Sequence, residues 1–288
     1  MEPPVQPTET NAELSPSEAL AARAFWFDGR DTTDSSREVP VETPVNVMYD
    51  SKPFAVMMCT PRDLEDFAYG FSLTEGIVEQ ASDIHRVVCN TVDRGIELRV
   101  SFAPWATPNL GDRARNTAGR TGCGLCGIDQ LDALPMASVR KRSHAGVHVD
   151  AVRRGLAALD QRQELNRVTH AVHAAAWCTA EGEIVAIRED VGRHNALDKL
   201  IGALMRAGHK AGDGFLVITS RCSFEMVEKA ATYGASTIVA ISAPTSLAVE
   251  RATLHGMTLL AVARRDGALV FNGADSVHTG EVAGTIAR

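Results

Sequence analysis

The sequence predicts an α/β fold: a mostly parallel sheet in the second half of the chain, preceded by a smaller α+β unit. From residue 150 onward, short apolar segments alternate with amphipathic segments of helical period, which is typical of strands joined by helical crossovers. Earlier, strand-like segments surround one helical segment. A chain of 288 residues can bury such a core without disulfides. The expected parts are a flexible tail over residues 1–38, the α+β unit over 39–106, a loop segment over 107–149 and the α/β domain over 150–288.

The first part of the chain changes character near residue 39. Residues 1–38 are rich in Pro, Glu, Ser, Thr and Asp, which predicts a tail with one short ordered piece at 19–27. A helix is expected just after Pro61, because the N–H that proline lacks would be unpaired in the first turn. Gly76 is placed to end this helix. Strands are expected at residues 45–49, 54–59, 84–92 and 95–102.

The second half is more regular. Asp150 is expected to cap a long helix, and a turn at 180–182 is expected to join two strands. The predicted helices cover residues 150–166, 194–206, 223–233 and 245–254, and the predicted strands cover 169–178, 183–187, 215–219, 237–242, 258–263 and 268–271.

Three loops of this domain follow strands and precede helices, and they should meet at one edge of the sheet. Ligands of such sheets bind beyond the carboxyl ends of the strands. Helix N-termini offer free N–H groups and a positive dipole end, so the loops favour an anion. The alternative is that Ser223 and Thr245 only cap their helices, while Glu189, Asp190 and Arg193 form a local ion-pair turn. The donors expected at this edge are Arg193, Ser220, Arg221, Ser223, Thr245 and Ser246.

Composition and charge exclude several classes of protein. The formal net charge of −7 argues against a general nucleic-acid binder. Residues 1–20 lack the pattern of a secretory signal, and no apolar run is long enough to cross a bilayer. We therefore expect a cytoplasmic protein, with no membrane association, whose six cysteines are reduced. Cys59, Cys89 and Cys178 lie in apolar segments and should be buried, and Cys222 should be packed between a strand and a helix.

The remaining cysteines, Cys123 and Cys126, are separated by two residues and lie among glycines after a polar segment at 108–120. This context predicts an exposed loop that presents the thiols. A structural zinc site needs four ligands, and no second cysteine or histidine pair has finger-like spacing. A thioredoxin-type pair would follow a core strand at a helix start, whereas this pair follows a polar loop without such a strand. Nucleobase deaminases use His-x-Glu, and none of the nine histidines has Glu two residues later.

A fourth chemistry for the pair is that of a sulfur carrier. The nucleophilic thiolate must be exposed and its pKa moderately lowered. Arg113, Arg115 and Arg120 precede the pair and favour the thiolate electrostatically. These residues alone support the sulfur-carrier interpretation and the structural zinc site equally.

Eight motifs occur in order along the chain and are highly specific together. Over most of residues 39–273 the chain resembles the formate dehydrogenase accessory sulfurtransferases, the FdhD family. The motifs are Thr60-Pro61 with Asp63-Leu-Glu, Gly70-Phe71, Thr74-Glu-Gly-Ile77, Cys-Gly-Leu-Cys-Gly at 123–127, His173-Ala-Ala175, and the segments 189–199, 220–229 and 242–250.

This resemblance implies a cytidine-deaminase-like core without deaminase activity. It also implies that sulfur is received from a cysteine desulfurase as a persulfide and passed to the molybdenum or tungsten of a bis(molybdopterin guanine dinucleotide) cofactor, which formate dehydrogenase requires. That cofactor would be a bound substrate, with no permanent cofactor or metal. By motif position, Cys123 carries the persulfide and Cys126 is its partner. A homodimer is expected by the same resemblance.

The family's cofactor-binding segment falls on Val262, Ala263, Arg264, Arg265, Asp266 and Gly267. The sequence departs from the family there, with Val262 in place of an aromatic residue and Arg265-Asp266 in place of small ones. It departs again at 169–172, where relatives tend to have Thr-Gly-Gly. The loops after residues 187, 219 and 242 suit the pyrophosphate of the guanine dinucleotide. Two alternatives remain open: a cofactor-binding chaperone without sulfur transfer, and a zinc-binding structural module.

Overall fold

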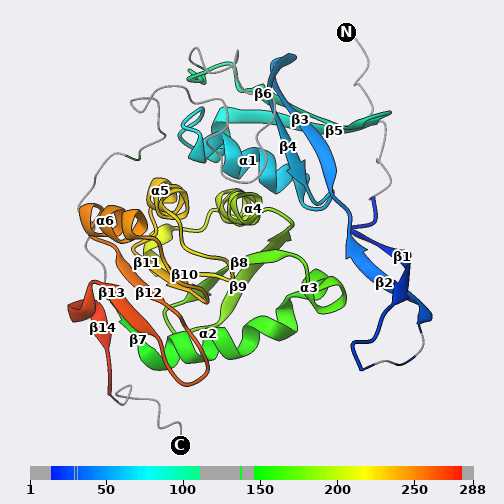
Figure 1. Ribbon diagram of the computed structural model, residues 1–288. Helices are drawn as coiled ribbons and strands as arrows, with labels where there is room; N and C mark the ends of the chain where they lie inside the picture. Colours follow the sequence, from blue (N-terminus) through cyan, green and yellow to red (C-terminus); the bar gives the residue numbers. More distant parts are fainter. Residues whose placement is uncertain (1–13, 29, 31, 111–136, 138–145, 281–288) are drawn as a thin grey trace, which may run out of the picture.

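The computed structural model describes residues 14–28, 30, 32–110, 137 and 146–280. Within them, a six-stranded sheet with helices on both faces forms the larger part of the molecule, and a four-stranded sheet with one helix lies against it (Figure 1). The strands and the helix expected between residues 39 and 106 are all present.

The larger sheet has the strand order β13-β12-β11-β10-β8-β9. Helices α4, α5 and α6 cover one face and α2 covers the other (Figure 1). The strands are β8 (His173–Thr179), β9 (Ile184–Asp190), β10 (Gly214–Ile218), β11 (Thr237–Ala240), β12 (Thr258–Ala261) and β13 (Leu269–Asn272), and the helices are α2 (Val149–Arg162), α3 (Glu164–Thr169), α4 (Arg193–Arg206), α5 (Phe224–Tyr233) and α6 (Ser246–Leu254).

The expectation of a mostly parallel sheet is wrong, because the sheet is mixed. Strand β11 pairs in parallel with β10 and with β12, while β8 is antiparallel to both β9 and β10, and β13 is antiparallel to β12. The short connections from β8 to β9 and from β12 to β13 allow only antiparallel pairing. Strands β9, β10, β11 and β12 nevertheless run in the same direction. Their carboxyl ends therefore share one edge of the sheet, as the sequence predicted.

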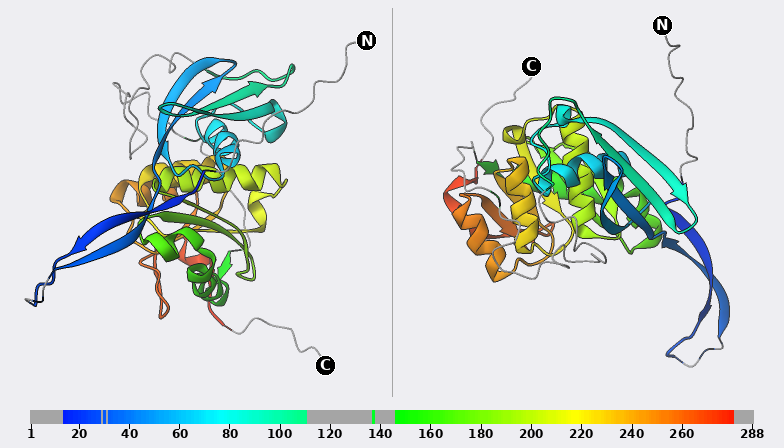
Figure 2. Two further views of the ribbon diagram at one scale, coloured as in Figure 1. Left: turned by 90° about the vertical axis from the view of Figure 1, so that its right-hand side faces the viewer. Right: turned by 90° about the horizontal axis from the view of Figure 1, so that it is seen from above.

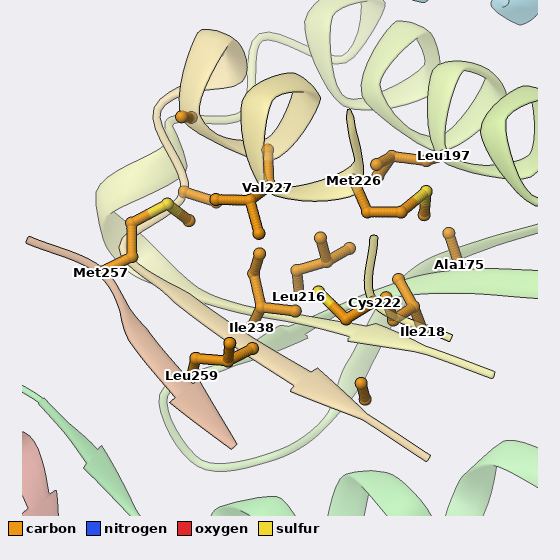
Figure 3. Close-up of a cluster of buried hydrophobic side chains, with 14 of the residues drawn as sticks. Ala175, Leu197, Leu216, Ile218, Cys222, Met226, Val227, Ile238, Met257 and Leu259 are labelled. Carbon is orange, nitrogen blue, oxygen red and sulfur yellow. The ribbon is translucent and has the colours of Figure 1, made fainter. Parts of the chain in front are cut away.

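The core between the sheet and α4–α6 is built from side chains that alternate along the strands. Ala175 and Trp177 of β8 point to this side, whereas Ala176 and Cys178 point to α2. Figure 3 shows the cluster on the α5 side, in which the strands contribute Leu216, Ile218, Ile238 and Leu259 and the helices contribute Leu197, Met226 and Val227.

The helix predicted over residues 150–166 is two helices that break at Gln163, whose ψ of 77° is not helical. Asp150 is not the N-cap. That position belongs to His148, whose Nδ1 accepts the N–H of Asp150 at 3.1 Å. Thr169 ends α3 and His170 is left-handed with φ 53°, so the strand expected from residue 169 begins only at His173.

The smaller unit has the strand order β4-β3-β6-β5, with α1 packed between this sheet and α4 (Figure 1). Its core combines aliphatic side chains with aromatic ones, and Phe67 and Phe71 of α1 are among those that are fully buried. The elements are β3 (Thr43–Tyr49), β4 (Lys52–Cys59), α1 (Leu64–Thr74), β5 (Ile84–Val92) and β6 (Gly95–Phe102), with a 3-10 turn at Ala81–Asp83.

Helices α1 and α4 are in backbone contact through two glycines. A Cβ on Gly70 would lie 1.8 Å from the carbonyl oxygen of Asp198, and one on Gly202 would lie 1.8 Å from that of Asp66. Only glycine allows two helices to approach this closely. The glycines therefore fix the smaller unit against α4.

The flexible tail predicted over residues 1–38 is largely a β-hairpin in the part that the structure describes. Strands β1 (Ser17–Ala24) and β2 (Thr33–Pro40) pair antiparallel and project from the body as a hairpin (Figure 2). The ordered piece expected at 19–27 falls on β1 and the start of its turn. The elements that complete the described fold are the parallel pair β7 (Val147–His148) and β14 (Val277–His278), and 3-10 turns at Ala211–Asp213 and Ala274–Ser276.

Candidate functional site

The loops that follow β10, β11 and β12 are joined at the carboxyl edge of the sheet by backbone hydrogen bonds. The N–H of Cys222 donates to the carbonyl of Ala243 at 3.3 Å, and the N–H of Thr245 donates back to the carbonyl of Cys222 at 2.9 Å. The N–H of Val262 donates to the carbonyl of Ser242 at 3.2 Å. The structure thus joins two of the three loops that the sequence singled out, those after β10 and β11, and adds Val262, the first residue of the segment 262–267.

Two long helices begin at this edge without a side-chain cap. The N-cap of α4 is Gly192, which has no side chain, and the N-cap of α5 is Ser223, whose hydroxyl makes no capping hydrogen bond. Thr245, in contrast, caps α6, because its Oγ1 accepts the N–H of Ala248 at 3.2 Å. Both residues therefore stand at N-cap positions, but only Thr245 makes a capping hydrogen bond with its side chain. The side chains at the N-cap positions of α4 and α5 thus satisfy none of the first-turn N–H groups of these helices.

Three buried polar atoms cluster at these two helix starts without a hydrogen-bond partner in the described part of the chain. They are Nε of Arg193, Nε2 of His194 and Oγ of Ser223. His194 is 5% exposed, and its Nε2 lies 3.9 Å from Oε2 of Glu225, so its ring faces the start of α5. Buried polar groups are normally paired, because desolvation without a partner costs about 1–3 kcal/mol. Unpaired donors gathered at one place are suited to a polar ligand.

Glu225 adds a negative charge to this cluster. Burial acts to raise the pKa of Glu225, but the neighbouring His194 and Ser223 more than offset it, so the pKa of this carboxyl is lowered. The carboxylate therefore stays ionised and faces the imidazole of His194. A ligand here would meet the guanidinium of Arg193, the imidazole of His194 and one carboxylate.

His173, at the start of β8, belongs to the same edge. Burial lowers the pKa of His173, and the positive charges of Arg193, His194 and Arg221 lower it further, with only Asp190 opposing them. The imidazole is thus held neutral beside two arginines. The sequence prediction of the site did not include His173, His194 or Glu225. Their positions at a strand start and in the first turns of helices were the available signal.

The other residues predicted at this edge are divided between structure and solvent. Ser220 is buried and donates its hydroxyl to the carbonyl of Arg221 at 3.1 Å, while the side chains of Arg221, Thr245 and Ser246 are exposed. Arg193 and Arg221 therefore remain as the cations available to an anionic ligand.

The segment 262–267 begins at the edge and is exposed from Arg264 onward. Val262 is left-handed with φ 52°, a strained conformation for a β-branched residue, and Ala263 is buried. The guanidinium of Arg264 donates to the carbonyls of Ile241 and Ala263, which ties the segment to the loop after β11. Arg265, Asp266 and Gly267 are exposed. Their expected contacts with a cofactor remain a prediction.

The motif 189–199 does not form the local ion-pair turn considered as an alternative. Glu189 instead accepts the N–H groups of Leu165 and Asn166, both at 2.8 Å. Asp190 is fully buried and lies 2.7 Å from Nζ of Lys199. Arg193 is thus left free of both carboxylates.

Cys123 and Cys126 lie outside the described residues. The four described cysteines are poor nucleophiles, because burial raises the pKa of Cys59 well above normal, that of Cys89 to about 11, and those of Cys178 and Cys222 to about 12. Cys222 packs in the core with Ile218 and Met226, as expected (Figure 3). Cys89 is only half-buried, where the sequence predicted burial. In the ranges that the structure covers, no group of three or more His, Cys, Asp or Glu residues could hold a metal ion.

Comparison with known proteins shows which family this chain belongs to. The model of the FdhD/NarQ family matches residues 40–278. The chain belongs to the FdhD/NarQ family. It is 44% identical over 269 residues to the sulfur carrier protein FdhD of Cupriavidus necator, covering 93% of each chain. It is 46% identical over 246 residues to the protein of the same name from Xanthomonas euvesicatoria, covering 85% of this chain and 88% of the relative.

A solved structure of the same fold is that of a Desulfotalea psychrophila protein described provisionally as a formate dehydrogenase accessory protein. Its TM-score is 0.73 at 22% sequence identity, over 92% of this FdhD/NarQ chain and 100% of the other. The expected likeness to cytidine deaminases is not tested by this comparison and stays a prediction. No helix in the described residues is both long and apolar enough to cross a membrane.

Proposed function

We propose that this protein is a sulfur carrier for formate dehydrogenase maturation, with Cys123 as the carrier residue. Its relatives at 44% and 46% identity bear the name sulfur carrier protein FdhD. The observation that carries the proposal is that Cys59, Cys178 and Cys222 are buried and Cys89 is half-buried, with raised thiol pKa values, which leaves Cys123 and Cys126 as the thiols for the chemistry.

The loading step is a thiol–persulfide exchange. The Cys123 thiolate attacks the outer sulfur of a persulfide on a cysteine desulfurase. The new bond joins that sulfur to Cys123, and the S–S bond of the donor breaks to release the donor's cysteine thiolate. Arg113, Arg115 and Arg120 precede Cys123 in the sequence and favour its thiolate form.

The release step assigns a role to Cys126. Its thiolate attacks the inner sulfur of the Cys123 persulfide and forms a Cys123–Cys126 disulfide. The outer sulfur leaves as sulfide, which the molybdenum or tungsten of the bis(molybdopterin guanine dinucleotide) substrate accepts. A cellular dithiol must then reduce the disulfide before the next cycle.

The sheet edge is proposed to hold the anionic part of that substrate. A pyrophosphate needs several convergent donors, and the starts of α4 and α5 offer free N–H groups beside Arg193 and Arg221. The unpaired atoms of Arg193, His194 and Ser223 support this assignment. Val262 to Gly267 begin at the same edge and are proposed to contribute to the site, as are Ser220, Thr245 and Ser246.

The deciding experiment is mass spectrometry after incubation with a cysteine desulfurase and cysteine. The peptide that contains residues 123–126 should gain one sulfur. The Cys123→Ser variant should gain none, while Cys126→Ser should load and then fail to release. Cys222→Ser is the matched control and should load like the original chain. Unchanged labelling of Cys123→Ser would refute the assignment.

A second candidate is a cofactor-binding chaperone without sulfur transfer. It is favoured by the donor cluster on the sheet edge, whose unpaired atoms belong to Arg193, His194 and Ser223. In that case a double Cys123→Ser, Cys126→Ser variant would still activate formate dehydrogenase. Under the carrier proposal the double variant is inactive. A zinc module would instead show stoichiometric metal in the purified protein.

A further inference from the structure

The outer edge of the larger sheet carries an exposed apolar strand. Strand β13 ends the strand order, and no strand of the described chain pairs with its free side (Figure 1). Leu269 is 57% exposed, Val270 38% and Phe271 40%. Successive residues of a strand point to opposite faces, so both faces of β13 are open at this edge. Soluble proteins usually protect an edge strand with charges or proline, and β13 contains neither.

Helix α6 extends this apolar surface. Oγ1 of Thr253 donates to Oδ1 of Asn272 at 3.1 Å, which places the end of α6 beside the end of β13. Leu254 and Leu247 lie seven residues apart on one side of the helix, and both are exposed. A contiguous exposed apolar surface marks an interaction site, whereas single exposed apolar residues do not. We call this surface the β13–α6 patch, and it consists of Leu247, Leu254, Leu269, Val270 and Phe271.

The residues of this region are arranged symmetrically about Val270. Arg265 lies five positions before Val270 and Asp275 five positions after it, and both are exposed. Leu269 and Phe271 lie one position to either side. A two-fold axis near Val270 therefore brings Arg265 of one copy toward Asp275 of a second copy. Leu269 meets Phe271 in the same way, and each contact occurs twice.

Local charge and strand geometry favour this arrangement. The three residues 264–266 before β13 hold two arginines and one aspartate, whereas the turn after it, Ala274–Ser276, is negative through Asp275. An antiparallel contact thus pairs opposite charges, while a parallel contact would place like charges together. Phe271 has no partner on β12, because the register shifts there. Such a bulge interrupts a ladder, so the contact is made by side chains rather than by extension of the sheet.

We propose that the β13–α6 patch is an interface between two copies of this chain, related by a two-fold axis near Val270. Apolar side chains form its centre, and the contacts of Arg265 with Asp275 lie at its rim. Within one copy Arg265 has only an exposed contact of 3.7 Å with Asp160, so its guanidinium is available. A standard interface uses about 20–30 residues a side, so this smaller patch should give a dimer that dissociates at roughly micromolar concentration. No sequence motif located this surface.

Sedimentation velocity of the full chain over a concentration series tests the patch. The original should change from monomer to dimer through the micromolar range. Leu269→Lys places a charge at the centre of the interface in both copies and should weaken dimerisation about 100-fold. Val185→Lys is the matched control and should dimerise like the original, because Val185 is 37% exposed on β9, at the opposite edge of the sheet.

Three outcomes of this experiment would overturn the interface. They are an original chain that stays monomeric at every concentration, a Leu269→Lys variant that dimerises normally, and a dimer that Val185→Lys disrupts. The measurement uses ligand-free protein and does not depend on sulfur transfer.

An exchange of charges tests the two-fold orientation. Arg265→Glu and Asp275→Arg each bring like charges together at both ends of the interface, and each should weaken dimerisation about 10-fold. The double variant restores opposite charges in reversed order and should dimerise within about 3-fold of the original. Single variants that dimerise normally, or a double variant as weak as the single ones, would overturn the arrangement about Val270.

Discussion

Buried polar groups occur in two regions of this protein, and the two regions differ in whether these groups have hydrogen-bond partners. Where the smaller unit meets α4, they are paired. Asp190 accepts the N–H of Thr60 at 3.0 Å and lies 2.7 Å from Lys199, and Lys229 donates to Asp198 and to Thr74. At the starts of α4 and α5, the polar atoms of Arg193, His194 and Ser223 have no hydrogen-bond partner in the described structure.

The difference separates two uses of one sequence motif. The segment 189–199 supplies Asp190 and Lys199 to the paired interface, and Arg193 and His194 to the unpaired sheet edge. Paired charges hold the two parts of the molecule together, because removing one leaves the other desolvated. Unpaired donors contribute nothing to that attachment and remain available to a ligand.

The largest expected effect is a loss of stability when a buried ion pair between the smaller unit and α4 is disrupted. Lys199→Met leaves the Asp190 carboxylate buried without its counter-ion, and should lower the free energy of unfolding by about 3–5 kcal/mol. Urea unfolding of the full chain measures this. Lys210→Met removes an exposed lysine and should change stability by less than about 0.5 kcal/mol. Equal stability of the two variants would show that the interface does not depend on the buried pair.

A smaller effect is expected at the unpaired edge, and it concerns binding rather than stability. Arg193→Gln should leave the urea midpoint nearly unchanged, since Nε of Arg193 has no partner to lose in the region described. Its affinity for guanosine diphosphate should fall by about 10- to 100-fold, the equivalent of a hydrogen bond to a charged group. Calorimetric titration measures this, with Arg153→Gln on α2 as the control. A destabilised Arg193→Gln with unchanged affinity would assign Arg193 to the fold instead.

The smallest effect is a dependence of stability on pH at the same edge. The folded protein lowers the pKa of His173 below its ordinary value of 6.5. The unfolded chain therefore takes up this proton first, and the stability contributed by the neutral imidazole is complete above about pH 6.5 and declines as pH falls through the lower folded pKa. His173→Gln should flatten the unfolding free energy measured between pH 7 and 5, relative to His209→Gln, which alters an exposed histidine. A slope that persists in His173→Gln would exclude this histidine as its source.

Local pattern was enough to predict most of the elements. Apolar alternation and helical period located the strands and helices after residue 180, with boundaries shifted by a few residues. Around residue 165 the same reasoning failed, because the break at Gln163 and the left-handed His170 carry no apolar signature. The hairpin of β1 and β2 was missed because its residues are polar or small and mostly exposed, so no buried face marked it as a sheet.

The sequence by itself determined that strand ends and helix starts would meet at one edge, since that follows from chain direction. It also determined that Cys123 and Cys126 differ from the other four cysteines, since glycines and a polar segment surround only them. Only the tertiary structure decided which charged residues hold the fold and which remain for a ligand. Thr60 and Asp190 are 130 residues apart, and Thr74 and Asp198 are 124 apart. Pairings at such separation are set by packing of distant elements, which no local period encodes.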